Sequence, residues 1–482
     1  MSLLLVLIPL IASAVLLLTR PAGARAIALA ATVANLGLTI FMLSGFNPST
    51  PGYVHEFDVP WIAEAGIHFH LGLDGISMLM VILSNLLSPL IVYSSFGKSY
   101  ENEARYYGLI TMMVGALNGV FMAIDGLAFY VFYELALIPI YFICAIWGGE
   151  NRIRITLKFF IYTFIGSLFM LVAMLYVYLK TPGEHTFNWM QLMQTPLTAE
   201  ASWWVMLGFF LAFAVKMPVF PFHTWQPDTY VSAPTGGTML LSGIMLKMGV
   251  YGAIRWMIPL ADESLHWWQP IFIGLAVTGI VYASIIAVKQ SDLKRLIAYS
   301  SIAHVGLIAA GLLAWNQTGV QGAMIQMLSH GINVVGLFLV VDIIEKRIGS
   351  RSLSEMGGIA KSAPVFATLF MIIMLGAVAV PLTNGFPGEF LLLNGVWNYS
   401  NWAGAIAGLT IIFGAVYMLR AYGLAMFGPA NEASSRFAPL QSNELLVLGA
   451  IAVLVIVLGF FPQAVLSLTE PAVKQLIEQP HF

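Results

Sequence analysis

Runs of about 20 apolar residues follow one another along almost the whole 482-residue chain, separated by short polar connections. Only 9% of the residues are charged, whereas a soluble domain has about 25%. A backbone that meets lipid must satisfy its own hydrogen bonds, so runs of this length fold as membrane-spanning helices. The chain is therefore predicted to be an all-α polytopic membrane protein.

Hydropathy predicts about fourteen transmembrane helices along the chain. The predicted spans are 2–19, 26–45, 75–97, 106–124, 126–147, 157–179, 203–225, 235–259, 267–288, 295–314, 321–344, 362–395, 401–427 and 443–468. The loop 46–73, between the second and third spans, is predicted to be a short hairpin. Its histidines and acids are too irregularly spaced to predict a metal site.

Two of these spans carry helix-breaking residues in their interior. The seventh has Pro218 and Pro221 directly after Lys216, and the twelfth contains PLTNGFPG followed by Glu389. Because proline removes a backbone donor, discontinuous helices 7 and 12 are predicted. Comparable breaks in the two halves of a transporter indicate inverted repeats. Helices 4–8 and 9–13 then form two five-helix repeats of opposite orientation.

These repeats divide the chain into four predicted segments. Residues 1–105 hold the first three helices and the outer loop, and 106–260 hold the first repeat. Residues 261–428 hold the second, inverted repeat, and 429–482 hold the fourteenth helix.

Basic residues fall almost entirely in one set of alternate loops. Sixteen of the 21 Lys and Arg lie there and three lie in the opposite set, which leaves Lys216 and Lys247 within spans. The positive-inside rule therefore places the basic loops in the cytoplasm and both termini on the outer side. Lys294 is predicted to lie in a basic cytoplasmic turn, and Asp342 on a solvated helix face.

Ionisable side chains inside the spans are the clearest functional signal. A charge at membrane depth is costly, so it normally faces a partner or a water-filled cavity and marks an ion or proton path. Glu134 and Lys216 are predicted to pair and, with Lys247 and Glu389, to carry protons. The alternatives are a structural salt bridge for Glu134, snorkelling for the lysines and helix capping for Glu389.

Three histidines lie in or beside these spans. His304 and His330 fall on consecutive spans with serines nearby, and a neutral imidazole can relay a proton at either nitrogen. Packing histidines or axial haem ligands are the alternatives for this pair. His223, with Asp228, is predicted to admit protons near the cytoplasmic face, unless the two groups only cap the helix locally.

Several common catalytic signatures are missing from the sequence. It has no dinucleotide-binding glycine loop, no P-loop and no H-E-x-x-H motif, and Cys144 is the single cysteine. No cofactor or metal is therefore predicted in this chain. The net charge of −2 gives no sign of a nucleic-acid partner. Energy for transport is expected from an ion gradient or from a partner subunit.

Five stretches together resemble a known family. FYVFYELALIPIYF, AVKMPVFPFHTWQPD, APTGGTMLLSGIMLKMGVYG, SDLKRLIAYSSIAHVG and NGFPGEF are similar to the proton-pumping membrane subunits of NADH:quinone oxidoreductase (complex I). The resemblance covers most of the chain. It implies fourteen helices, two inverted repeats and no cofactor here, with flavin, iron–sulfur clusters and quinone in partner subunits.

The resemblance also implies residue roles. These are a coupled pair (Glu134, Lys216), a central lysine (Lys247), a hydrophilic axis (His304, His330) and an acid of the second half-channel (Glu389). Most members of the family carry a lysine where this chain has Glu389. None of these positions departs from the implied roles. Gln226 is a minor departure, because an aliphatic residue is expected there.

The same resemblance implies an assembly. The chain would belong to a respiratory complex of the bacterial cytoplasmic membrane, with chains L and N of that complex on either side and the peripheral redox arm reached only indirectly. Two alternatives remain: a subunit of a multisubunit cation/proton antiporter, and a membrane scaffold that does not pump.

Overall fold

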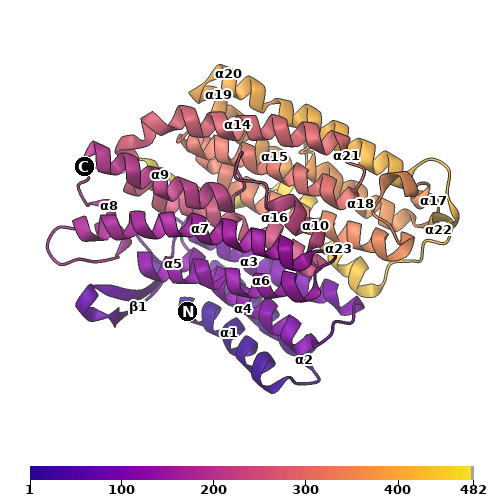
Figure 1. Ribbon diagram of the computed structural model, residues 1–482, viewed down its shortest axis with the longest axis horizontal. Helices are drawn as coiled ribbons and strands as arrows, with labels where there is room; N and C mark the ends of the chain where they lie inside the picture. The colour runs from indigo at the N-terminus through magenta and orange to yellow at the C-terminus, as the bar shows by residue number, and fades with distance from the viewer. Residues whose placement is uncertain (479–482) are drawn as a thin grey trace.

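The computed structural model describes residues 1–478, which form one bundle of long helices that run back and forth, roughly along the horizontal direction of Figure 1. Twelve helices in this part of the chain are long and apolar enough to cross a membrane. Two further crossings fall outside that set: α4 (Glu103–Met122), and the interrupted pair α18 (Pro364–Ala377) and α19 (Gly385–Tyr399). Together they confirm the fourteen predicted spans.

The other crossings follow the predicted order. The first six of them are α1 (Ser2–Thr19), α2 (Ala24–Ser44), α3 (Gly75–Ser94), α5 (Gly126–Leu135) with α6 (Leu137–Trp147), α7 (Arg152–Lys180) and α9 (Ala199–Lys216). The eighth crossing, here called helix eight, is built from several short segments. After it come α14 (Leu265–Lys289), α15 (Leu293–Leu313), α16 (Gln317–Ile348), α20 (Asn401–Ala407) with α21 (Leu409–Met426), and α23 (Ser442–Phe460). Helix eight consists of α11 (Thr235–Leu240), η3 (Leu241–Met245), α12 (Lys247–Gly252), η4 (Ala253–Met257) and α13 (Ile258–Leu260).

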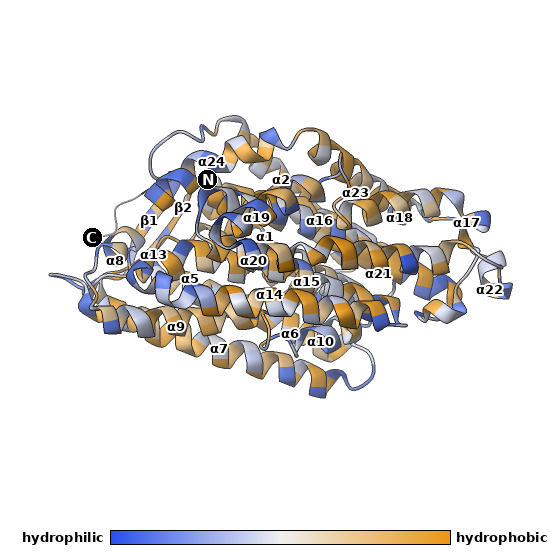
Figure 2. Cartoon of the chain, turned by 90° about the horizontal axis from the view of Figure 1, so that it is seen from above, coloured by the Kyte–Doolittle hydropathy of each residue, from blue (hydrophilic) through white to orange (hydrophobic). Residues whose placement is uncertain are grey.

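Short elements connect these crossings. They are α8 (Trp189–Met193), α10 (Gln226–Ser232), α17 (Ile359–Ser362), α22 (Glu432–Ser435), η1 (Ala63–Ala65), η2 (Ser95–Gly97), η5 (Asp262–Ser264) and η6 (Leu353–Glu355). Hydrophobic residues dominate the outer helices α7 and α9, whereas hydrophilic ones are frequent around α17 and α22 at one end of the bundle (Figure 2).

The loop between α2 and α3 forms the predicted hairpin. Strands β1 (Val54–Ile62) and β2 (Ile67–Leu73) pair in antiparallel register, with Asp58 opposite His70. The acids and histidines bond to one another: His68 lies 2.7 Å from Asp58, and His70 lies 2.8 Å from Glu56. No group of three metal-ligating side chains occurs among residues 1–478.

Both ends of the described chain lie at the hairpin end of the bundle. Ser2 donates a hydrogen bond to His55 O of the hairpin at 2.7 Å. Helix α24 (Gln463–Glu478), which the sequence interpretation did not predict, packs against α3 at that end. The last four residues of the predicted segment 429–482 lie outside the described residues.

The basic loops meet at the opposite end of the bundle. Arg25 pairs there with Glu103, and Arg351 pairs with Asp292 at 3.2 Å. The alternation of loops that was predicted from charge is therefore the alternation of the two ends of the bundle.

Both predicted helix breaks are present. Helix α9 ends at Lys216 and α10 begins only at Gln226, while α18 ends at Ala377 and α19 begins at Gly385. Helix α9 runs about 27 Å from the hairpin end before it breaks, and α18 runs about 21 Å from the basic end. The two breaks therefore lie toward opposite ends of the bundle, as inverted repeats require.

The fifth span contains a third interruption, which was not predicted. Helix α5 ends at Leu135 and α6 begins at Leu137, so Glu134 lies in the last turn before the break. Pro139 has no N–H to donate to the carbonyl of Leu135, and this loosens the helix here.

A buried ion pair joins α16 to α23 near the basic end. Arg347 donates to the two carboxylate oxygens of Glu444 at 3.2 and 2.5 Å, and neither side chain is more than 7% exposed. Arg347→Met would leave Glu444 buried and unpaired, which costs about 3–5 kcal/mol. We expect a lower midpoint of thermal unfolding for Arg347→Met.

The double variant Arg347→Met/Glu444→Leu removes both charges and should recover most of that loss. The exposed pair between Arg436 and Glu432 provides the matched control, since Arg436→Met should leave the midpoint unchanged. An unchanged midpoint for Arg347→Met would show that the buried pair does not stabilise the bundle.

Candidate functional site

Lys247 lies at the centre of helix eight, whose residues from Gly236 to Leu260 are all buried. The segments η3 and η4 on either side of it are π-helical, and the Leu246 N–H accordingly reaches back five residues to Leu241 O at 3.1 Å. The Lys247 ammonium donates to Ser242 O at 2.6 Å. Single π turns inside α-helices are frequent at functional sites.

The next partner of Lys247 is His330 of α16. The Lys247 Nζ lies 3.0 Å from His330 Nδ1, and His330 Nε2 lies 3.1 Å from Ser301 Oγ of α15. An ammonium can only donate, so His330 Nδ1 accepts and the ring carries its proton on Nε2 when Lys247 is charged. The imidazole thus contacts a proton donor on one side and a hydroxyl on the other.

A second buried group lies one turn further along α15. His304 Nδ1 lies 2.8 Å from Glu389 Oε1, and both side chains are less than 10% exposed. Gln326 of α16 donates to the same carboxylate oxygen at 3.4 Å, and the Tyr417 hydroxyl lies 3.4 Å from His304 Nε2. The ring centroids of His304 and His330 are 6.2 Å apart.

The structure therefore brings four predicted residues into one buried chain. It runs from Lys247 on α12 through His330 on α16 and His304 on α15 to Glu389 on α19. Gln326, which sequence reasoning missed, lies one helical turn before His330 on the same face, and this spacing is a usable signal. No comparable spacing in the sequence indicated Tyr417.

The predicted direct pair between Glu134 and Lys216 is not formed in the described chain. The Lys216 Nζ instead lies over the ring of Tyr133, 4.8 Å from its centroid. A cation over an aromatic face is stabilised by the ring quadrupole.

Close packing connects the first break to helix eight. Gly249 of α12 lies against the end of α9, where a side-chain carbon would lie 3.2 Å from Lys216 Cβ and 3.0 Å from Phe213 O. Only glycine allows this approach without displacement. Lys216 therefore packs against the helical turn that carries Lys247.

His223 lies inside the first break and is buried. Its ring stacks on Phe220 and meets Tyr282 edge-on, with centroids 5.6 and 5.2 Å away, and its Nδ1 has no partner within the described chain. Asp228, predicted to act with His223, instead pairs with Arg295 at 3.0 Å. The amide of Gln226 is fully buried and has no hydrogen-bond partner among residues 1–478.

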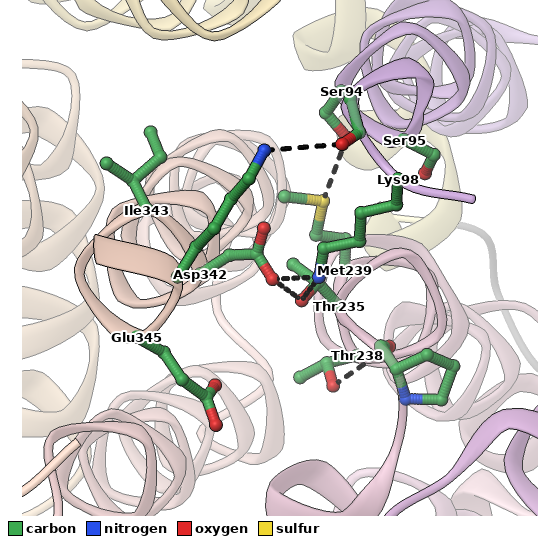
Figure 3. A network of polar contacts seen from close by, with 12 residues as sticks. Ser94, Ser95, Lys98, Thr235, Thr238, Met239, Asp342, Ile343 and Glu345 are labelled. Atoms are coloured by element: carbon green, nitrogen blue, oxygen red, sulfur yellow. Dashed lines mark hydrogen bonds and ion pairs between the residues drawn. The ribbon is translucent and has the colours of Figure 1, made fainter. Parts of the chain in front are cut away.

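Two charged side chains near the basic end are more buried than their sequence context indicates, and for Asp342 the predicted solvated face is wrong. Lys294 is only 5% exposed and donates to Val231 O at 3.2 Å and Ala233 O at 2.8 Å. Asp342 is also largely buried, and it bonds to Lys98 and to the Thr235 hydroxyl (Figure 3). Hydropathy cannot reveal these contacts, because residues near helix ends resemble solvated ones until the neighbouring helices are placed.

A buried chain of lysine, histidine and glutamate between two interrupted helices defines the class of ion-translocating membrane proteins. Within this class, residues 123–414 match the family described as NADH:quinone oxidoreductase/Mrp antiporter, TM. Subunit M of NADH-quinone oxidoreductase from Rickettsia conorii is 39% identical over 464 residues, which cover 95% of this chain and 93% of that one. The chain therefore belongs to the NADH:quinone oxidoreductase/Mrp antiporter transmembrane family.

Solved structures agree with this assignment. A chain of respiratory complex I from Thermus thermophilus superposes with a TM-score of 0.91 at 34% identity, covering 99% of this chain and all of that one. A chain of the Mrp complex from Dietzia gives a TM-score of 0.87 at 20% identity, over 99% of this chain and 97% of that one. At that identity the second likeness shows the shared fold alone.

Proposed function

We propose that this chain is the proton-translocating subunit M (chain 4) of a respiratory NADH:quinone oxidoreductase, driven by quinone reduction elsewhere in the complex. The contact chain from Lys247 to Glu389 is the observation that supports the proposal most directly. A scaffold would have no reason to bury these groups, because apolar residues of the same size would pack at lower cost.

Proton transfer begins at Lys216 in this proposal. The charge of Glu134 stabilises the protonated lysine, and loss of that charge favours release toward Lys247. Two unit charges about 6 Å apart interact with roughly 2.8 kcal/mol at an effective dielectric constant near 20. Moving one charge against about 150 mV costs roughly 3.5 kcal/mol. Electrostatic coupling between neighbouring buried charges is therefore of the required size.

The later steps follow the contacts. Lys247 Nζ donates its proton to His330 Nδ1, and His330 releases the proton from Nε2 toward Ser301 and His304. His304 Nδ1 then delivers it to Glu389, which lies beyond the second break on the hairpin side. A ring that accepts at one nitrogen and donates from the other resets by rotation or by exchange with water.

The placement in the membrane is part of the same proposal. The basic end faces the cytoplasm, and the hairpin and both termini face outward. Chains L and N of the complex are the neighbours, and the electron-carrying groups are in other subunits, so this chain holds no cofactor. Segments 106–260 and 261–428 act as two inverted half-channels joined at Lys247.

Neutral substitutions near the first break test the uptake step. Glu134→Gln keeps the shape of the side chain but removes the charge beside Lys216, and Lys216→Ala removes the proton carrier. We expect each variant to lower NADH-driven proton pumping severalfold in membrane vesicles, while the complex still assembles. Full pumping in either variant would contradict the assigned roles.

Purification separates the proposed function from its alternatives. The tagged chain should copurify with subunits that contain flavin and iron–sulfur clusters, and NADH should drive vesicle acidification in sodium-free buffer. Copurification with small antiporter subunits, together with sodium- or potassium-dependent exchange that needs no NADH, would instead assign the chain to an antiporter. Normal pumping after neutral substitution of all four residues from Lys247 to Glu389 would identify a scaffold.

A further inference from the structure

The corner between α10 and α11 is held by charged groups on two sides. On one side, the Lys294 ammonium donates to Val231 O and Ala233 O, at the last turn of α10. On the other side, the Asp342 carboxylate accepts from the Thr235 hydroxyl and from Lys98 (Figure 3). Lys98 also donates to Thr235 Oγ1 at 3.2 Å.

This corner connects the two proton-carrying lysines. Helix α10 follows the break after Lys216 and has only seven residues, so it is not anchored by a continuous helix. Helix α11 begins at Thr235 and leads directly to Lys247. The carbonyls at the end of a short helix lack internal partners and carry partial negative charge, which explains the position of the Lys294 ammonium.

The holding groups come from three other helices. Lys98 directly follows η2 at the end of α3, Lys294 lies on α15, and Asp342 lies on α16. Helix α15 also carries His304, and α16 also carries His330. These contacts therefore hold the corner against both helices that carry the histidines of the proposed relay.

Charged groups are an expensive means of holding two helices together. An apolar contact of the same volume is often equal or better for stability, whereas removal of one partner of a buried pair is strongly destabilising. Asp342 is 12% exposed on its side chain, and Lys294 is 5% exposed as a residue. A purely structural contact at this place would not require these charges.

We propose that Asp342 is a positioning residue of the pump. With Lys98 and Lys294 it holds the α10–α11 corner against α15 and α16, so that Lys216, Lys247 and His330 keep the spacing that proton transfer needs. This inference rests on the proposed function and adds a residue that touches none of the proton-carrying groups.

The test uses the intact complex in proteoliposomes, with pumping expressed as protons moved per NADH oxidised and per bound flavin. Asp342→Asn should lower this ratio at least fivefold, and Asp342→Glu should recover at least half of it, because the longer carboxylate still reaches Lys98. Asp58→Asn, on the exposed hairpin, provides the matched control and should change nothing.

A double apolar variant separates positioning from stability. Lys98→Met/Asp342→Leu removes both charges without leaving one unpaired, so the complex should assemble normally yet pump with a low ratio. If it pumps with the normal ratio, the pair is only structural and the inference is wrong. The double variant and Asp342→Glu still decide the question if Asp342→Asn fails to assemble.

Lys247→Ala, measured in parallel, distinguishes a failure of the proposed function from a failure of the positioning role alone. Normal pumping by Lys247→Ala would overturn the proposed function itself. Loss of pumping by Lys247→Ala together with normal pumping by Asp342→Asn would overturn only the positioning role.

Discussion

Replacing Lys247 with methionine is expected to lower NADH-driven proton pumping tenfold or more, the equivalent of at least 1.4 kcal/mol in the transfer step. Methionine fills a similar volume in the buried middle of helix eight but cannot carry a proton. The variant loses both contacts of the ammonium, to Ser242 O and to His330 Nδ1. Acidification of inverted vesicles, normalised to assembled complex, measures the effect.

Lys247→Arg shows whether charge or proton release is required. Arginine keeps the positive charge but stays protonated at all accessible pH values, so it should fail as completely as methionine. Lys180→Met, at an exposed lysine near the hairpin end, is the matched control and should pump normally. Normal pumping by Lys247→Arg would show that this position supplies only a fixed charge.

Glu389→Gln is the second substitution with a large expected effect. Glutamine keeps the shape of the side chain and can still contact Gln326. It has no carboxylate, however, and so cannot accept a proton from His304. We expect pumping to fall at least tenfold, because the last buried acceptor of the chain is removed. The measurement is again vesicle acidification driven by NADH.

Glu389→Asp should retain part of the activity, since the carboxylate is shorter but present. Glu432→Gln is the control, because Glu432 is 82% exposed on its side chain and lies outside the contact chain. Pumping by Glu389→Gln at the normal rate would mean that protons leave the relay before reaching the second break.

The geometry also explains why the relay runs across the bundle. The two breaks lie toward opposite ends, so in the proposed function each half-channel opens toward one side only. The link between them passes through α15 and α16, the most deeply buried of the long helices after helix eight. In the proposed function, this lateral chain transfers the proton between the two half-channels.

The sequence by itself determined the crossings, the two major breaks and the ionisable residues in the middle of the spans, but not the buried charges near the helix ends, such as Lys294 and Arg347. A backbone that crosses lipid must satisfy its own hydrogen bonds, and apolar runs of this length do so as helices. Length and hydropathy are therefore sufficient to locate the spans. Proline and glycine disrupt a helix at their own positions, so the discontinuities after Lys216 and before Gly385 could be predicted from the sequence. Loop charge likewise predicted which loops share one end of the bundle.

Only the tertiary structure decided which of these residues meet. Lys98 and Asp342 are 244 positions apart, and their contact depends on how α3 and α16 pack. Lys216 was predicted to pair with Glu134 and lies over the ring of Tyr133, and the contact between His304 and Glu389 was not predicted. Hydropathy gives the length of a helix but not its rotation about its own axis, and that rotation is set by side-chain packing between helices distant in sequence.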